Sequence, residues 1–250
     1  MTAIRSKSNR PGLGDQTPKR ILRAAIREFS AHGLSGARTD AIAESAGANK
    51  ALLYYYFKSK QGLYEAALEE VSGTVVENAL AALDPKYSAG ERLLRTALNH
   101  FDRILTQHEF QSFMHQEMVR FRRDERGSMP VIYRTAFQPL MEKLRLSVEE
   151  GVKAGELCQL DWLQVAYSIF GPNVFYFLSA PMMQLVLPFE PMNEAALGSR
   201  RKAVAEFLGN ALFTDRAHGS KLAQRVLEAM PMPKVKKSPL RKGNIRRKNV

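Results

Sequence analysis

The sequence contains little cysteine and little tryptophan: its 250 residues include one of each, Cys158 and Trp162. A single thiol excludes an intrachain disulfide, and sparse cysteine is typical of proteins of the reducing cytoplasm. The N-terminal stretch MTAIRSKSNRPGLGDQ also lacks the apolar core of a secretory signal. We therefore expect a cytoplasmic protein without a disulfide framework.

Long hydrophobic runs are almost absent as well. The segment from Trp162 to Phe189 carries no charged residue over 28 positions, a length that could span a bilayer. However, Pro172, Pro181 and Pro188 interrupt it, and neither flank carries the basic cluster that orients a membrane helix. The segment is therefore expected to form a buried helix followed by a proline-rich loop, and no membrane association is expected.

The sequence also lacks the pattern of a half-buried strand. Apolar and polar residues do not alternate for a full strand length anywhere in the chain. Apolar residues instead recur at spacings of three and four, for example through 93–105, 113–121 and 133–148. This period predicts an all-α fold.

Catalytic and metal-binding motifs are missing too. The five histidines do not form an HExxH or other metal-ligand spacing, and neither a GxSxG nor a P-loop sequence is present. Cys158 has no histidine near it in the sequence that could activate the thiol. We expect no enzymatic activity, no cofactor and no metal site.

Positive charge is in excess. Lys and Arg number 37 against 25 for Asp and Glu, which gives a formal net charge of +12. Residues 1–20 hold five basic residues and one acidic residue, and residues 216–250 hold eleven and one, whereas residues 21–215 hold 21 and 23. A surplus of this size indicates an anionic partner such as nucleic acid or acidic lipid. The end of the chain after Pro231 contains no acidic residue and is expected to be disordered.

The segment TDAIAESAGANKALLYYYF, residues 39–57, is the most informative part of the chain. Thr39 is expected to cap a short helix that ends at Gly47, and a second short helix is expected over about residues 49–56. Two short helices joined at a small residue are typical of a helix-turn-helix, with Leu53 seating the second helix on the core. An ordinary helical hairpin is the alternative, because short helix pairs are common in all-α proteins.

Residues 47–60, GANKALLYYYFKSK, closely resemble the recognition helix and the following helix start of the tetracycline repressor (TetR/AcrR) family, whose pattern runs Gly-Val-Ser-Lys-Gly-Thr-Leu-Tyr-His-Tyr-Phe-x-Ser-Lys. The likeness extends over about residues 17–70. Asn49, Leu52 and Tyr55 depart from the pattern, which has Ser, Thr and His there. These positions lie on or beside the surface that faces DNA, so the resemblance implies DNA binding but no particular operator sequence.

The chemistry of these residues agrees with the resemblance. Lys50 places a flexible cation near the positive start of the expected recognition helix, where it could reach a guanine edge or a phosphate. Adjacent residues point about 100° apart on a helix, so at least one of Tyr54 and Tyr55 faces outward, whereas Tyr56 and Phe57 are assigned to the interior. From these arguments and from what the resemblance implies, the residues expected to contact DNA are Thr39, Asn49, Lys50, Ala51, Tyr54, Tyr55 and Lys60.

The family resemblance also implies that the longer remaining region binds a small-molecule effector and forms a dimer, although no local motif supports this. Met and aromatic side chains adapt to irregular apolar ligands, but stripes at helical spacing also form plain hydrophobic core. The last two expected helices, 161–180 and 194–213, are apolar enough to meet a second copy of the chain. The candidate effector-binding residues are Phe101, Phe113, Met114, Met118, Phe121, Tyr133, Phe137, Met141, Tyr167 and Phe170.

Taken together, the sequence predicts an all-α chain with an N-terminal three-helix helix-turn-helix DNA-binding domain and a larger helical ligand-binding and dimerisation domain. The expected parts are a disordered basic arm (1–16), the DNA-binding domain (17–62), the effector domain (63–215) and a basic, disordered tail (216–250). The expected function is a homodimeric transcriptional repressor that leaves a palindromic operator when a small apolar or amphipathic effector binds. The alternatives are a ligand-independent, basic-tailed architectural DNA-binding protein and a helical enzyme acting on lipid-like substrates.

Overall fold

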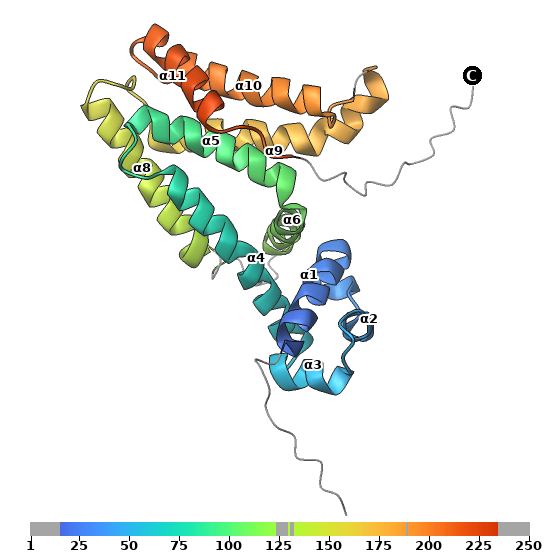
Figure 1. Ribbon diagram of the computed structural model, residues 1–250. Helices are drawn as coiled ribbons and strands as arrows, with labels where there is room; N and C mark the ends of the chain where they lie inside the picture. The colour runs from blue at the N-terminus through green and yellow to red at the C-terminus, as the bar shows by residue number, and fades with distance from the viewer. Residues whose placement is uncertain (1–15, 124–129, 131–132, 189, 235–250) are drawn as a thin grey trace, which may run out of the picture. The chain divides into compact units, whose positions relative to one another are not determined.

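The computed structural model describes residues 16–123, 130, 133–188 and 190–234. Its elements are α1 (Thr17–Gly36), α2 (Thr39–Ser45), α3 (Lys50–Phe57), α4 (Lys60–Ala82), α5 (Ala89–Thr106), α6 (His108–Arg122), the π-helix η1 (Tyr133–Phe137), α8 (Gln138–Lys153), α9 (Trp162–Val186), α10 (Glu194–Ala211) and α11 (Arg216–Ala229) (Figure 1). Within these described ranges the β interaction is limited to an isolated bridge between Leu157 and Phe213. The predicted all-α fold is confirmed.

The chain divides into two compact units. The first comprises residues 1–77 and 108–139, and the second comprises residues 78–107 and 140–250. This division differs from the expected boundary after residue 62, because α4 up to Glu77 and all of α6 belong to the first unit. Tyr64 of α4 and Phe113 of α6 are fully buried in the same core as the helix-turn-helix.

Aromatic rings and one buried carboxylate form the centre of the first unit. The rings of Phe29 and Tyr64 meet edge to face with centroids 5.0 Å apart, and Phe113 packs against both. The Tyr64 hydroxyl donates to Glu117 Oε1 at 2.8 Å, and Arg120 Nη1 donates to the same oxygen at 2.7 Å. The Glu117 side chain is fully buried, so these charge-assisted hydrogen bonds compensate for its lost hydration.

A second polar contact joins α6 to α1. Gly33 adopts φ 68° and ψ 177°, which interrupts the helical conformation of α1. Such an interruption leaves carbonyl groups of the preceding turn without partners further along the helix. Gln116 Nε2 donates to the carbonyl oxygens of Phe29 and Ser30, at 3.2 Å in each case. The side-chain amide of α6 therefore caps the interrupted turn of α1.

The second unit is built around α5, which contacts α9, α10 and α11. Figure 1 shows α10 and α11 side by side, as their extensive contacts require. Leu93 and Leu98 of α5, Ile169 of α9 and Leu208 of α10 are buried in this core. Arg201 of α10 forms a bidentate ion pair with Asp102 of α5 at 2.8 Å and also donates to the carbonyl of Met230.

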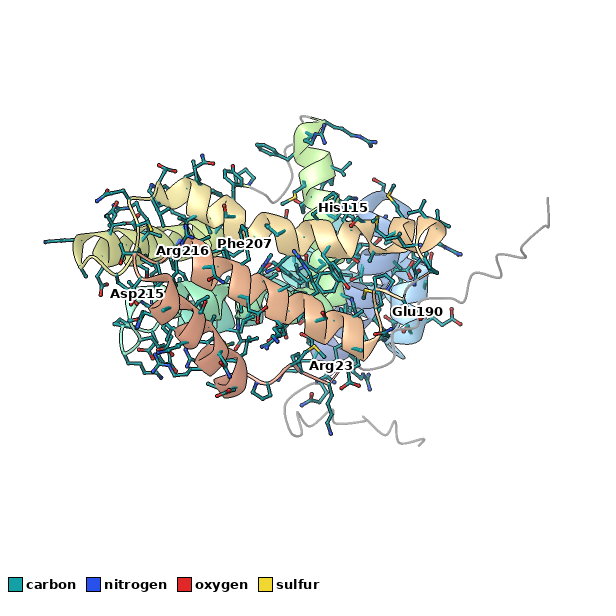
Figure 2. The ribbon with its side chains drawn as sticks, turned by 90° about the horizontal axis from the view of Figure 1, so that it is seen from above. Arg23, His115, Glu190, Phe207, Asp215 and Arg216 are labelled. Atoms are coloured by element: carbon teal, nitrogen blue, oxygen red, sulfur yellow. The ribbon has the colours of Figure 1, made fainter. Side chains whose placement is uncertain are left out.

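The expectation that the chain is disordered from residue 216 is wrong for residues 216–229, which form α11. Asp215, at the turn before α11 (Figure 2), accepts hydrogen bonds from the backbone N–H groups of Ala217 and His218. Leu222 and Val226 then fall on one face and are buried against the core. The basic segment 235–250 and the arm 1–15 lie outside the described residues.

Among the helices of the described ranges, none has the length and apolarity that a membrane span requires. This finding includes α9, which occupies most of the charge-free stretch noted in the sequence.

Candidate nucleic-acid interface

The first turn of α2 and the start of α3 form the surface predicted to meet DNA. Thr39 was expected to cap α2, but Arg38 occupies the capping position and α2 begins at Thr39 itself. The Thr39 hydroxyl instead lies 3.5 Å from the Tyr54 hydroxyl of α3, and its side chain is largely buried. Arg38 has the extended backbone conformation that precedes a helix, so α2 starts one residue earlier than expected.

The sequence of α3 explains how it is held. Gly47 adopts φ 59° in the turn after α2, a conformation that favours glycine. The Asn49 side chain caps α3 by accepting a hydrogen bond from the backbone N–H of Leu52 at 2.8 Å. Leu53 is fully buried in the core of the first unit. The predicted helix-turn-helix and the predicted seating of Leu53 are confirmed.

The outer face of α3 carries two tyrosines. Tyr54 is 38% exposed and Tyr55 is 68% exposed, so both present surface to a partner, where the sequence required only one. Tyr56 and Phe57 are half-buried and pack against the core of the first unit, which agrees with the interior role assigned to them. Asn49 and Ala51 are exposed near the start of the helix.

Lysines surround this face. Lys50 Nζ lies 2.9 Å from Asp40 Oδ1 and 3.1 Å from Asp40 Oδ2, and this hydrogen bond raises the pKa of Lys50 above its usual value. Lys60 Nζ donates to the carbonyl of Ser35 at 3.2 Å. The Lys50 ammonium therefore remains charged at neutral pH beside the start of α3, where a helix terminus favours anions.

Sequence reasoning did not identify two further residues of this surface, Asp40 and Lys58. Lys58 ends α3 with φ 65°, donates to the carbonyl of Tyr55 at 2.8 Å and has its Nζ 5.5 Å from the centre of the Tyr55 ring. The position of Lys58 between the aromatic run 54–57 and Ser59 was the feature of the sequence that could have identified it. Asp40 gave no such signal, because its partner Lys50 lies on another helix.

The candidate effector-binding residues do not gather at one place. Two of them, Phe113 and Met114, are buried in the core of the first unit, and Phe137 packs against that core. Met118, Phe121 and Tyr133, also in the first unit, are exposed. The second unit contains the remaining four, Phe101, Met141, Tyr167 and Phe170. Helical spacing therefore showed neither which of these side chains are buried nor which core contains them.

Phe101 is buried against Tyr176 and Phe177, and Met141 and Phe170 pack against the main core of the second unit. Tyr167 is exposed on α9. For all ten candidate residues the effector-binding role stays a prediction.

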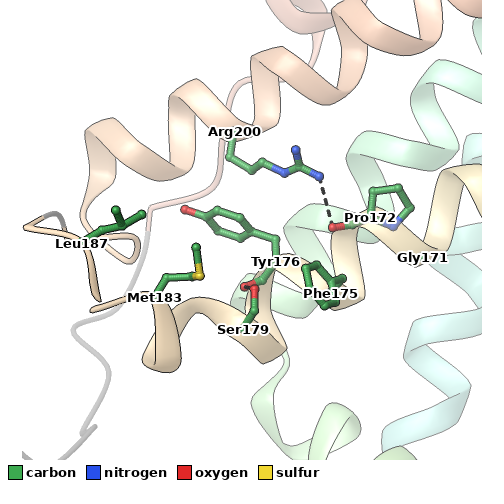
Figure 3. Close-up of a pocket in the computed structure, with 8 residues that line it drawn as sticks. All are labelled: Gly171, Pro172, Phe175, Tyr176, Ser179, Met183, Leu187 and Arg200. Carbon is green, nitrogen blue, oxygen red and sulfur yellow. Dashed lines mark hydrogen bonds between the residues drawn. The ribbon is translucent and has the colours of Figure 1, made fainter. Parts of the chain in front are cut away.

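A groove of about 590 Å³ opens between α9 and α10 (Figure 3). Arg200 of α10 reaches across it, donates from Nη2 to the carbonyl of Pro172 at 3.1 Å, and lies over the Tyr176 ring. The groove is otherwise mainly apolar, and none of the candidate effector-binding residues lines it. Its lining residues are Gly171, Pro172, Phe175, Tyr176, Ser179, Met183, Leu187 and Arg200.

A buried polar pair lies between α5 and α9 in the second unit. The Asn173 side chain is fully buried, and its Nδ2 donates to the carbonyl of Ala97 at 3.0 Å. His100 Nδ1 is 3.4 Å from the same Nδ2, and the His100 ring meets Phe170 edge to face. Burial, with a smaller contribution from the Arg103 cation, lowers the pKa of His100 to about 3. Asn173 Oδ1 has no hydrogen-bond partner within the described part of the chain.

The described residues include no group of three His, Cys, Asp or Glu side chains close enough to hold a metal ion.

The sequence around the helix-turn-helix matches a known protein family. Residues 21–67 match the family model described as bacterial regulatory proteins, tetR family. The transcriptional repressor SCO4008 of Streptomyces coelicolor is 46% identical over 56 residues, which cover 22% of this chain and 29% of that protein. This match is therefore confined to a small part of each protein.

Longer matches extend beyond the helix-turn-helix. The probable transcriptional regulator YttP of Bacillus subtilis is 30% identical over 151 residues, which cover 58% of this chain and 69% of YttP. A transcriptional regulator from Saccharomonospora viridis, solved in complex with choline, has the same fold with a TM-score of 0.63 and 18% identity, over 80% of this chain and 99% of that one. The relatives are regulators rather than enzymes, and the chain belongs to the tetR family of bacterial regulatory proteins.

Proposed function

We propose that this chain is a homodimeric transcriptional repressor that binds a palindromic DNA site and leaves it when a small molecule binds the second unit. The observation that carries the proposal is the surface of α3. Lys50, Tyr54 and Tyr55 are exposed on a short helix that the buried Leu53 fixes to the core. Such a helix can enter the major groove, with the ammonium and hydroxyl groups binding phosphates and base edges.

The face formed by α9 and α10 supports dimerisation. Val174, Leu178 and Met182 recur at intervals of four on α9 and are exposed, and Phe207 of α10 is exposed as well (Figure 2). An apolar patch of this kind marks a protein interface. Phe175, which is also exposed on α9, lines the groove beside Arg200. A second copy that covers this face would complete a two-fold pair, as a palindromic site requires. The two copies of α3 must then lie about 34–36 Å apart to read successive major grooves.

The buried pair His100 and Asn173 supports the effector part of the proposal. A buried oxygen without a partner is costly, so Asn173 Oδ1 is suited to accept a hydrogen bond from a bound molecule. Phe170, whose ring meets His100 edge to face, adds apolar surface beside the pair. An amphipathic effector with a hydrogen-bond donor fits this chemistry. The choline complex of the Saccharomonospora viridis regulator supports a small-molecule site in this fold.

The proposal is tested with the full chain. Selection from a random duplex pool should enrich a palindrome with half-sites about one helical turn apart, and native mass spectrometry should show two chains per duplex. Equal affinity for the selected and scrambled duplexes would contradict the proposal and favour the architectural protein.

Mass spectrometry of molecules that co-purify with the protein should identify effector candidates. Such a molecule should weaken binding of the wild-type chain to the selected duplex. Asn173→Leu replaces the amide by an apolar group of similar size and should reduce this response without changing DNA affinity in the absence of ligand. Turnover of the molecule would instead support the enzyme alternative.

A further inference from the structure

The ion pair between Asp40 and Lys50 stands at the proposed DNA surface. Asp40 lies in the first turn of α2 and Lys50 in the first turn of α3. Their side chains are 63% and 50% exposed, and Lys50 Nζ contacts both carboxylate oxygens. An exposed ion pair contributes little to stability, and the interaction of a carboxylate in the first turn of α2 with the helix dipole adds only a small further stabilisation.

A carboxylate here works against simple phosphate binding. Any phosphate that approaches the Lys50 ammonium also approaches Asp40, and the two anions repel each other. The pair offers the DNA backbone nearly zero net charge, whereas an unpaired lysine would attract every duplex equally. Asp40 should therefore weaken sequence-independent binding.

The edge of a base pair offers hydrogen-bond donors next to acceptors, whereas a phosphate of the backbone offers acceptors alone. In the major groove, a G·C pair presents the guanine O6 and N7 acceptors next to the cytosine N4 amino donor. Lysine is suited to the guanine acceptors, and a carboxylate accepts a hydrogen bond from cytosine N4. Asp40 and Lys50 present an acceptor and a donor in direct contact, so one base pair can bind both.

We propose that Asp40 is a specificity-determining residue, which reads one G·C pair in each half-site together with Lys50 and disfavours binding to other DNA. The inference rests on the proposed DNA-binding function and adds the base pair that this surface recognises. Thr39 and Tyr54, whose hydroxyls lie 3.5 Å apart beside the pair, link the same two helices and help to fix its position.

The test uses the full chain, the duplex that it selects from a random pool, and a scrambled duplex of the same length and composition. Asp40→Asn removes the charge and keeps the size of the side chain. The matched control is Glu44→Gln, which removes the same charge from an exposed position one turn further along α2. Thermal unfolding of both variants establishes that they are folded.

We expect Asp40→Asn to bind the scrambled duplex more tightly and to lower the ratio of selected to scrambled affinity by at least about fivefold. Its binding to scrambled DNA should also depend more steeply on salt, by about 0.9 in the log–log slope for each additional phosphate engaged. Glu44→Gln should shift both affinities together and leave their ratio unchanged. Equal ratios for the two variants would overturn the inference.

A base-pair scan gives a second, independent readout. Replacing one G·C pair in each half-site by A·T should weaken binding of the wild type and have little effect on Asp40→Asn and on Lys50→Gln. If both variants retain the wild-type preference at every G·C position, Asp40 does not read a base. A wild type that does not discriminate between the two duplexes contradicts the proposed function itself, which separates the two failures.

Discussion

Helices α3 and α9 both expose large side chains, but the chemistry of those side chains differs. The exposed rings of α3, Tyr54 and Tyr55, end in hydroxyl groups and lie among lysines. On α9, Phe175 is 69% exposed and Leu178 is 64% exposed, and neither carries a polar atom beyond the backbone. Aromatic rings with a polar end suit a wet, charged partner, whereas a purely apolar face suits a protein surface that excludes water. Exposure identifies an interface, and the polar atoms on it indicate the partner.

The largest effect is expected from a charge on the α9 face. Phe175→Glu should turn the proposed dimer into a monomer, since losing the burial of one aromatic side chain costs about 2 to 3 kcal/mol and burying a carboxylate costs several more. A two-fold interface contains each substitution twice. Sedimentation velocity at micromolar concentration measures the result. Lys153→Gln makes the same change in net charge at an exposed position of α8 and should remain dimeric. A dimer in Phe175→Glu would show that α9 is not the interface.

A smaller effect is expected from a substitution on the polar, basic surface of α3. Lys50→Ala should reduce affinity for the selected duplex by about 1 to 3 kcal/mol at each half-site, because it removes one contact to a base or phosphate per subunit. Dimerisation and thermal stability should be unchanged, since the side chain is exposed. Fluorescence anisotropy at physiological salt measures the affinity, with Lys153→Ala as the control. Unchanged affinity would remove α3 from the DNA surface and with it the contrast with α9.

The sequence predicted the position of α3 but not its contact with α2. The features that position α3 are close together in the chain: Gly47 in the turn, Asn49 at the cap and Leu53 in the core. A local pattern was therefore sufficient to predict the helix. The contact between Asp40 and Lys50 was not predictable in this way, because it depends on how closely α2 and α3 pack.

Further along the chain, the predictions lacked information about contacts between residues that are distant in the sequence. Phe113 was assigned to an effector site from its aromatic character, but it packs with Phe29 and Tyr64, which precede it by many residues. Residues 216–250 were expected to be disordered because of their positive charge, and this composition outweighed the local sequence signals of α11. Those signals were Asp215 as a helix cap and a short amphipathic pattern that includes Val226, which the structure buries. Composition averaged over a long segment hides a helix of moderate length.

Buried polar groups of the second unit contrast with the exposed lysines of the first. Because the pKa of His100 is lowered to about 3, the folded protein holds this imidazole neutral at a pH where the unfolded chain protonates it, below about 6.5. The unfolded state then binds more protons, so the free energy of unfolding should fall by up to about 1.4 kcal/mol per pH unit as the pH decreases from about 6.5 towards 3. Urea unfolding at pH 7, 6, 5 and 4 measures this slope. His100→Gln should reduce it, and His218→Gln, at an exposed position, should not. Equal slopes would show that His100 is not held neutral.

The smallest effect at physiological salt is expected from the basic end of the chain, which has cations but no aromatic residues to accompany them. Residues 235–250 contain seven basic residues and no acidic residue. The deletion has to begin after Lys234, because a cut at Asp215 would also remove α11 and expose the core that it covers. Without residues 235–250, binding to selected and scrambled duplexes should weaken by the same factor. The dependence of log affinity on log salt should flatten by about 0.9 for each phosphate that the tail neutralises in the full chain.

A side chain that reads bases changes the ratio of the two affinities, whereas a cation that binds only phosphates changes only their common level. Deletion of residues 235–250 should therefore leave the ratio at its wild-type value, and Lys50→Ala should lower it. Affinity for both duplexes, measured across a salt series for the two variants side by side, tests this division of roles. If the deletion lowers the ratio, the tail reads sequence and α3 is not the sole source of specificity. If the deletion leaves the salt slope unchanged, the tail does not bind DNA, and the positive charge at this end of the chain serves another partner.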